Sequence, residues 1–133
     1  MELQVGVKVL LKNKEGKYLF LHRSKEKYPD MNRLWDFPGG RIDPGVSLLE
    51  NLKREVKEEA GIELVSEPKL IGAQDILKNG RHVVRLTYIA EADGKKPQLS
   101  DEHDEYAWLS LEEIRSREDF DKYLRELLAT GVL

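Results

Sequence analysis

Apolar residues occupy every second position at the start of the chain, which is the period of a β-strand. From Leu3 to Leu11 they alternate with mostly polar residues, so the pattern predicts a strand over this segment. The tetrapeptide NKEG then supplies a turn, and residues 17–23 (KYLFLHR) are a second strand-like run. We therefore expect a β-hairpin at the N-terminus, followed by an exposed loop over the polar residues 24–33.

The period lengthens to that of a helix after Gly45. Ser47 and Glu50 stand in the S-x-x-E arrangement of a capping box, and Gly61 lies where a helix C-cap is expected. At about 100° per residue, the apolar side chains between these caps share one stripe, which we expect to pack on a sheet. These side chains are Leu49, Leu52, Val56 and Ala60.

The second half of the chain combines further strands with helices. Residues 69–77 and 82–92 are strand-like, and the Asn79-Gly80 pair between them is a strong hairpin turn. A charged loop over residues 93–104 separates them from a third run of this kind.

That run, residues 105–110 (EYAWLS), predicts a short strand, and two helical segments follow, starting near Ser110 and Ser116. The pattern shows no repeat, no low-complexity tract and no linker. Strands mixed with a central helix and C-terminal helices predict a single α/β or α+β domain over residues 1–133.

Composition narrows the function classes. The chain has 133 residues, of which 35% are charged, and its net charge of −3 argues against a nucleic-acid polymer as partner. The absence of cysteine excludes disulfides, thiolate zinc sites and a cysteine nucleophile. No signal peptide or transmembrane run is visible, so we expect no membrane association and a cytoplasmic protein. The three histidines show no metal-ligand spacing.

Three carboxylates lie close together on the predicted central helix. Glu55, Glu58 and Glu59 share one sector of the helix, which borders the apolar stripe. In one interpretation, Glu50, Arg54 and Glu58 form i, i+4 ion pairs on a solvated face. That interpretation leaves Glu55 and Glu59 as like charges beside the core. A hard divalent cation relieves such repulsion, so a metal site is the second interpretation.

The turn before this helix favours the metal site. Pro38 fixes one backbone torsion, while Gly39 and Gly40 can adopt angles closed to other residues and let a ligand approach the backbone. A Gly-Gly pair alone is weak evidence. Placed before a capped helix that carries three clustered glutamates, it indicates a site for a metal or a phosphate.

This stretch resembles the Nudix box, G-x5-E-x7-R-E-U-x-E-E-x-G-U, where U is a bulky aliphatic residue. The preceding WDFPGG is also typical of that family. The resemblance covers essentially the whole chain and implies the family's α/β/α sandwich, an α/β fold with a mixed β-sheet between helices. The matching positions are Gly40, Arg54, Glu55, Val56, Glu58, Glu59, Gly61 and Ile62.

One position departs from the pattern, because the first glutamate of the box should fall at residue 46, where this chain has Val46. In the family that glutamate helps to hold the arginine and the carboxylates. Asp43 or Glu50 is a candidate substitute. If Arg54 instead lacks its partner, we expect a slow enzyme whose kcat rises when Val46→Glu restores the family's residue. The departure also supports an alternative, a non-catalytic nucleotide-binding or sensor module.

The resemblance implies a metal-dependent hydrolase that cleaves the pyrophosphate linkage of a nucleoside diphosphate derivative. A (deoxy)nucleoside triphosphate is the favoured substrate, with a nucleotide sugar or a dinucleoside polyphosphate as alternatives. Water would attack phosphorus while Mg²⁺ or Mn²⁺ neutralises phosphate oxygens. The small-molecule nucleotide is the expected partner, and a homodimer stays open because many relatives form dimers.

Residue roles follow from the matching positions. The resemblance implies that Glu55, Glu58 and Glu59, with the backbone carbonyl of Gly39, are metal ligands. Glu55 or Glu58 would orient or deprotonate the water, and Arg54 would brace the carboxylates.

Other candidates lie outside the box. Some family members use a carboxylate from a later loop as the base; here Glu102 is our first choice and Glu105 our second, unless this acidic run is only a solvated loop. Arg23 matches a phosphate-contacting position, although a strand-end arginine is also a common surface ion pair. Asp36 and Phe37 are expected at the rim of the substrate site.

Overall fold

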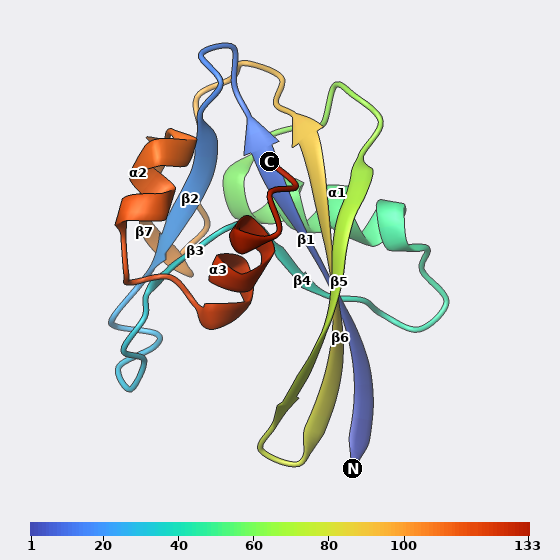
Figure 1. Cartoon of the computed structure of the whole chain (residues 1–133). Coiled ribbons are helices and arrows are strands. Elements are labelled where there is room, and N and C mark those ends of the chain that lie inside the picture. The colour runs from blue at the N-terminus through green and yellow to red at the C-terminus, as the bar shows by residue number, and fades with distance from the viewer.

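The computed structural model describes residues 1–133 and shows a mixed β-sheet with helices on both faces (Figure 1). The long strands β1 (Glu2–Lys12) and β6 (Arg81–Glu91) pair in parallel along their whole length. Strand β5 (Lys69–Lys78) returns antiparallel beside β6. Asn79 and Gly80 connect them with φ angles of 53° and 72°, which confirms the predicted hairpin turn.

The first two strands separate soon after their turn. Strands β1 and β2 pair only at Lys12 and Tyr18, and β2 then pairs with β3 and β7, while β1 pairs with β4 and β6. The two short strands around the Pro-Gly-Gly turn therefore fill the gap between the diverging strands. The remaining strands are β2 (Tyr18–Arg23), β3 (Trp35–Asp36), β4 (Gly39–Arg41) and β7 (His103–Leu109).

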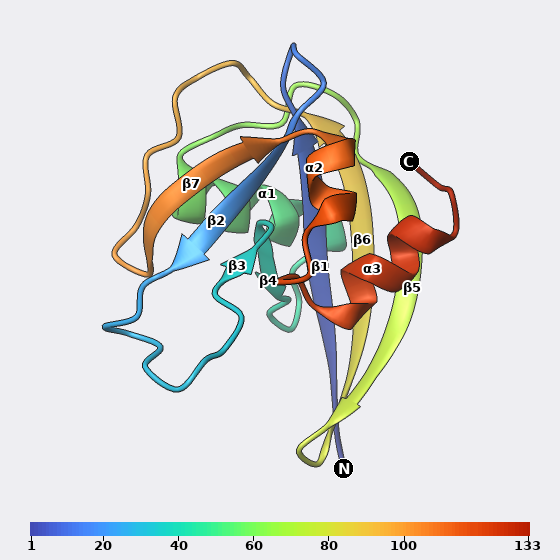
Figure 2. The ribbon, with the colours of Figure 1, turned by 60° about the vertical axis from the view of Figure 1, so that its left-hand side comes forward.

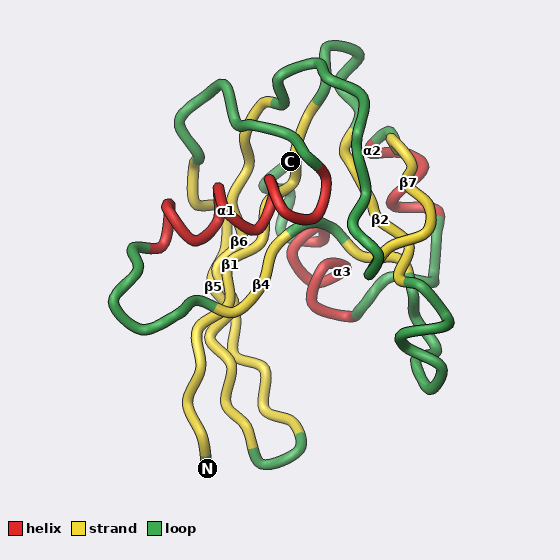
Figure 3. The backbone as a smooth tube through the Cα atoms, turned by 180° about the vertical axis from the view of Figure 1, so that it is seen from behind, coloured by secondary structure: helices red, strands yellow, loops and turns green.

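The helices form two outer layers. Helix α1 (Leu48–Ala60) lies on one face of the sheet, and α2 (Leu111–Ser116) and α3 (Lys122–Ala129) lie on the other, as Figure 2 and the rear view in Figure 3 show. This arrangement confirms the predicted α/β/α sandwich. None of the three helices has both the length and the apolar character needed to cross a bilayer.

Alternation along β1 supplies both hydrophobic cores. Val7 and Val9 point to α1 and are fully buried in the same cluster as Leu52 and Val56, which confirms the predicted apolar stripe. Leu10 points to the opposite face, where it joins a second cluster under α2 and α3. The strand that anchors both cores also carries part of the site described below.

Helix caps decide where the helices begin and end. The Ser47 hydroxyl accepts a hydrogen bond from the Glu50 N–H at 3.2 Å, which is one half of the expected capping box. Gly61 ends α1 with φ 66°, as predicted. The prediction of a helix starting near Ser116 was wrong. The Ser116 hydroxyl donates to a carbonyl of α2, and α3 begins later because the Asp121 carboxylate accepts from the Leu124 N–H at 2.8 Å.

Candidate active site

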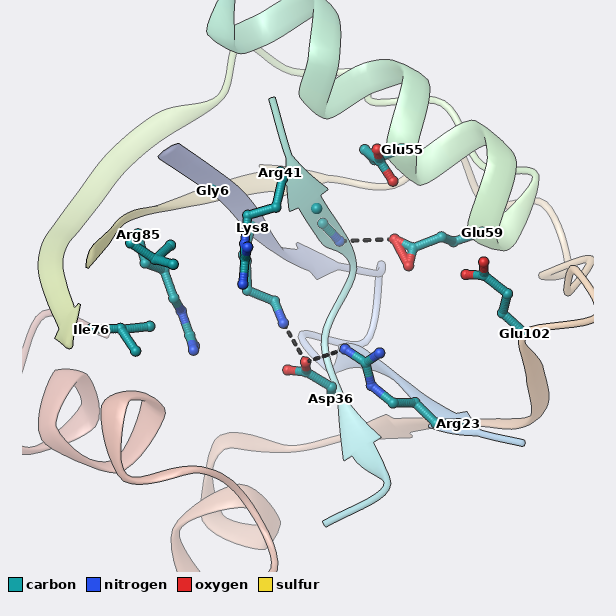
Figure 4. Close-up of a pocket in the computed structure, with 13 residues that line it drawn as sticks. Gly6, Lys8, Arg23, Asp36, Arg41, Glu55, Glu59, Ile76, Arg85 and Glu102 are labelled. Carbon is teal, nitrogen blue, oxygen red and sulfur yellow. Dashed lines mark hydrogen bonds and ion pairs between the residues drawn. The ribbon is translucent and has the colours of Figure 1, made fainter. Parts of the chain in front are cut away.

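A cavity of about 510 Å³ opens beside α1, where β1, β4 and β6 meet the loop before β7. Charged side chains dominate its lining (Figure 4). Carboxylates gather toward the α1 end, whereas Lys8 and Arg85 lie toward the opposite end, with Arg23 beside Asp36. The cavity therefore offers one acidic and one basic region to a ligand.

Glu59 lies against the glycine turn. Its Oε1 accepts a hydrogen bond from the Gly39 N–H at 2.9 Å. Burial raises the pKa of Glu59 to about 7, although the Gly39 N–H and the Lys8 ammonium act in the opposite direction. Burial also raises the pKa of Glu55, which faces the same cavity. Carboxylates whose ionisation is disfavoured in this way fit a hard divalent cation, which would relieve the cost of both charges.

The two glycines let the turn approach these carboxylates. A Cβ atom on Gly40 would lie 2.7 Å from the Glu55 carboxyl carbon. Gly39 has φ 151°, and a Cβ there would lie 2.2 Å from the Val7 carbonyl oxygen. The backbone therefore requires glycine at position 39, whereas glycine at position 40 leaves room for the Glu55 carboxylate.

Arg54 and Glu58 lie toward solvent. Glu58 does not line the cavity; its side chain is 58% exposed, and its Oε1 accepts from Arg54 Nη1 at 3.4 Å. The stronger contacts of Arg54 are made by Nη2, to Asp43 Oδ2 at 2.9 Å and Asn51 Oδ1 at 2.8 Å. Of the two substitutes weighed for the missing box glutamate, the structure therefore favours Asp43 over Glu50.

The acidic loop places one carboxylate in the cavity. Glu102 lines it at the same end as Glu59, and the backbone carbonyl of Glu102 accepts from the Ser24 N–H at 2.9 Å (Figure 4). Glu105 lies instead on β7 outside the cavity, paired across the sheet with His22. The structure thus brings our first choice, and not our second, to the box helix.

Asp36 binds two cations at the floor of the cavity. It accepts hydrogen bonds from the Lys8 ammonium and from Arg23 Nη2, the latter at 3.2 Å. Burial alone would raise the pKa of Asp36, but Lys8, Arg85 and Arg23 outweigh it and lower that pKa to about 2. Asp36 is therefore ionised and fixed. Sequence reasoning missed Lys8 because a lysine in an alternating strand is normally a solvated residue.

Arg85 is the other residue that sequence reasoning missed. It is only 5% exposed, and Nη1 donates to Asp121 Oδ2 at 2.8 Å, while Nε and Nη2 have no partner. Its guanidinium and the Lys8 ammonium both lie over the buried Phe37 ring. A single arginine within the apolar run VVRLTY was the available signal. Contact between Phe37 and substrate stays a prediction, which the burial of its ring in the second core does not favour.

His103 is a buried imidazole at the start of β7, and its pKa predicts a change of stability with pH. Burial, assisted by Arg23, lowers the pKa of His103 to about 4, so the folded state favours the neutral ring. The unfolded chain takes up the proton near pH 6.5. Stability should therefore be complete above that pH and fall as the pH drops toward 4, by an amount on the order of 2 kcal/mol after allowance for nearby solvent.

The measurement is denaturant unfolding of the wild type and His103→Gln at pH 7 and pH 4.5. We expect a smaller loss of stability between the two pH values in the variant. An equal loss in both proteins would show that His103 does not titrate in this range.

Comparison with known proteins agrees with this geometry. The NUDIX domain model matches residues 2–130. The chain belongs to the Nudix family. The crystal structure of a MutT protein from Methanosarcina mazei Go1 has 32% identity and a TM-score of 0.83, covering 97% of this chain and 92% of that one. Its similarity confirms the Nudix α/β fold.

Two curated Nudix relatives match part of the chain. Mouse bis(5′-nucleosyl)-tetraphosphatase (asymmetrical) is 36% identical over 105 residues, which are 73% of this chain and 69% of that protein. Human 8-oxo-dGDP phosphatase is 37% identical over 70 residues, 53% of this chain. The match spans only 20% of the length of that human protein.

Proposed function

We propose that this Nudix protein is a metal-dependent pyrophosphohydrolase that cleaves the pyrophosphate linkage of a nucleoside diphosphate derivative. The observation that carries the proposal is the pair of half-buried carboxylates, Glu55 and Glu59, whose pKa values are raised and which face a glycine turn in a cavity. Such a pair suits a cation, and the basic residues elsewhere in the same cavity suit an anion that the cation also binds.

In this proposal Glu55, Glu58 and Glu59 hold Mg²⁺ or Mn²⁺ together with the Gly39 carbonyl. The bound cation supplies positive charge to the phosphate oxygens and lowers the pKa of water. Glu58 is the outermost of the carboxylates and is engaged only by Arg54, at 3.4 Å, so it is free to join the set.

The basic residues would bind the rest of the nucleotide. Lys8 and Arg23 are held by Asp36, and Arg85, which lines the same cavity, has two nitrogens, Nε and Nη2, without hydrogen-bond partners. The printed names of the relatives refer to different nucleotides, 8-oxo-dGDP and a bis(5′-nucleosyl) tetraphosphate. We favour a (deoxy)nucleoside triphosphate because the four basic side chains that line this one cavity match a compact polyphosphate, whereas a second nucleoside would need additional residues to contact it.

The proposal predicts strict metal dependence. Hydrolysis of every nucleotide in a test panel should disappear when the protein is treated with a chelator and return on addition of Mg²⁺ or Mn²⁺. Without the cation, the negatively charged carboxylates would repel the phosphate groups of the substrate. Turnover that survives exhaustive chelation would contradict the metal mechanism. Nucleotide binding in Mn²⁺ without turnover would instead favour the alternative of a sensor module.

Glu102 is proposed to accept a proton from the attacking water, since it lies in the cavity at the same end as Glu59. Glu102→Gln should therefore lower kcat by about 10²-fold. Glu105→Gln and Asp101→Asn are matched controls from the same acidic run and should stay near wild type, because neither side chain lines the cavity. If Glu102→Gln also behaves like wild type, the base lies on α1.

A further inference from the structure

The Arg54 guanidinium is held by two hydrogen-bond acceptors, the side chains of Asp43 and Asn51. Nη2 donates to Asp43 at 2.9 Å and to Asn51 at 2.8 Å, and the same nitrogen lies 3.4 Å from Glu55 Oε1. Nη1 lies 3.4 Å from Glu58 Oε1. A guanidinium has a rigid, planar set of donors, so fixing one edge also fixes the direction in which the other edge faces.

Asn51 cannot turn away from this arrangement. Its side chain is completely buried on α1, and Nδ2 donates to the Arg41 carbonyl at 3.2 Å. Its Oδ1 accepts from the Asp43 N–H at 3.2 Å as well as from Arg54. A buried amide with donor and acceptor both engaged is locked in one orientation. Asn51 thus ties α1 to the segment after β4 and holds Asp43 within reach of Arg54.

The turn after Asp43 explains why residue 46 is not involved. The Asp43 carbonyl accepts from the Val46 N–H at 3.2 Å, and Gly45 adopts φ 84° between them. The chain therefore makes a tight turn here, with the Asp43 carboxylate on Arg54 and the Val46 side chain half-buried. The carboxylate that accepts from Arg54 therefore belongs to Asp43, at the start of the turn, and not to residue 46, at its end.

We propose that Asp43 and Asn51 are positioning residues that replace the glutamate missing at position 46. They hold Arg54 and, through it, Glu55 and Glu58, so that the site needs no acceptor at position 46. The kinetic consequences rest on the proposed hydrolase function. The expectation that Val46 leaves Arg54 without a partner is thereby corrected, and Val46→Glu should not raise kcat.

A simple surface ion pair is the competing explanation for the Asp43–Arg54 contact, because these side chains are 64% and 40% exposed. A pair of that kind adds little to stability, and its loss would leave both kcat and metal affinity unchanged. A positioning role predicts the reverse, with a small effect on unfolding and a large effect on the neighbouring carboxylates. The two explanations therefore differ in which measurement changes.

The test compares the wild type with Asp43→Ala, Val46→Glu and the double variant, with Glu50→Ala as a control. Glu50 is an exposed acid one helical turn before Arg54 that makes no bond to it. We expect Asp43→Ala to lower kcat by about 10-fold or more with little change in KM, because small displacements of catalytic groups are costly. Val46→Glu alone and Glu50→Ala should leave kcat within about 2-fold, and the double variant should recover most of the loss.

Binding of Mn²⁺ alone gives a second readout that needs no substrate. Asp43→Ala should weaken Mn²⁺ binding by roughly 10-fold or more, on the scale typical of residues that orient metal ligands. If the wild type hydrolyses no nucleotide, the proposed function fails, but this comparison still tests the positioning role. Equal Mn²⁺ affinity in both proteins, a rise in kcat for Val46→Glu alone, or a loss that the double variant does not recover would each overturn the proposal.

Discussion

Replacement of Glu59 by glutamine is expected to lower kcat by at least about 10²-fold while leaving the metal-free protein as stable as the wild type, or more stable. The amide oxygen can still accept the Gly39 N–H, which the carboxylate accepts at 2.9 Å. Above the raised pKa of about 7, the ionised carboxylate is a half-buried charge that the fold disfavours, and glutamine removes that charge. Glu55→Gln should behave in the same way.

The measurement pairs kcat at saturating Mg²⁺ with thermal unfolding in chelator. Glu112→Gln, an exposed carboxylate on the opposite helix layer, is the matched control and should change neither value. A clear drop in the unfolding temperature of Glu59→Gln together with near-normal turnover would show that Glu59 is a structural residue.

A single methyl group at position 40 is expected to have the second large effect. The Cβ of Gly40→Ala would lie 2.7 Å from the Glu55 carboxyl carbon, so the carboxylate must move. Only the end of a flexible side chain is displaced, and stability should change little. Turnover should fall by about 10²-fold, because the displaced group is a proposed metal ligand.

Two other glycines provide controls of opposite kinds. Gly6→Ala adds the same methyl to the same cavity, but its nearest neighbour lies at 3.7 Å, so activity and stability should be retained. Gly39→Ala would lie 2.2 Å from a backbone carbonyl and should lower the unfolding temperature. If Gly40→Ala keeps wild-type kcat, the position of Glu55 is not critical to the reaction.

Local signals predicted the box helix well, since its caps and apolar stripe are properties of one segment. The short strands β3 and β4 were not predicted, because Pro38 and two glycines indicate a turn and pairing with distant strands cannot be inferred from that segment. The same limit applied to Arg85. It lies opposite Gly6 only because β1 and β6 pair in parallel, a contact between segments far apart in the sequence.

The origin of the Arg54 contacts shows what a motif can and cannot predict. The box pattern located Arg54 and identified residue 46 as the departure, but it left Asp43 and Glu50 as equal substitutes. Only the geometry of the turn decides between them, because the hydrogen bonds of buried Asn51 hold Asp43 against the guanidinium. The spacing of the box therefore located the candidate site residues. The contacts that replace the missing glutamate depend on tertiary structure and could not be predicted from the spacing.

The most direct test of the central claim is ³¹P NMR of a nucleoside triphosphate incubated with Mg²⁺ and the protein. The wild type should convert it to nucleoside monophosphate and pyrophosphate, or to diphosphate and phosphate. A variant carrying both Glu55→Gln and Glu59→Gln, shown to be folded by its thermal unfolding, should leave the triphosphate intact. Equal conversion by the two proteins would contradict a hydrolase built on these carboxylates, as would the absence of conversion by the wild type across a panel that includes nucleotide sugars and dinucleoside polyphosphates.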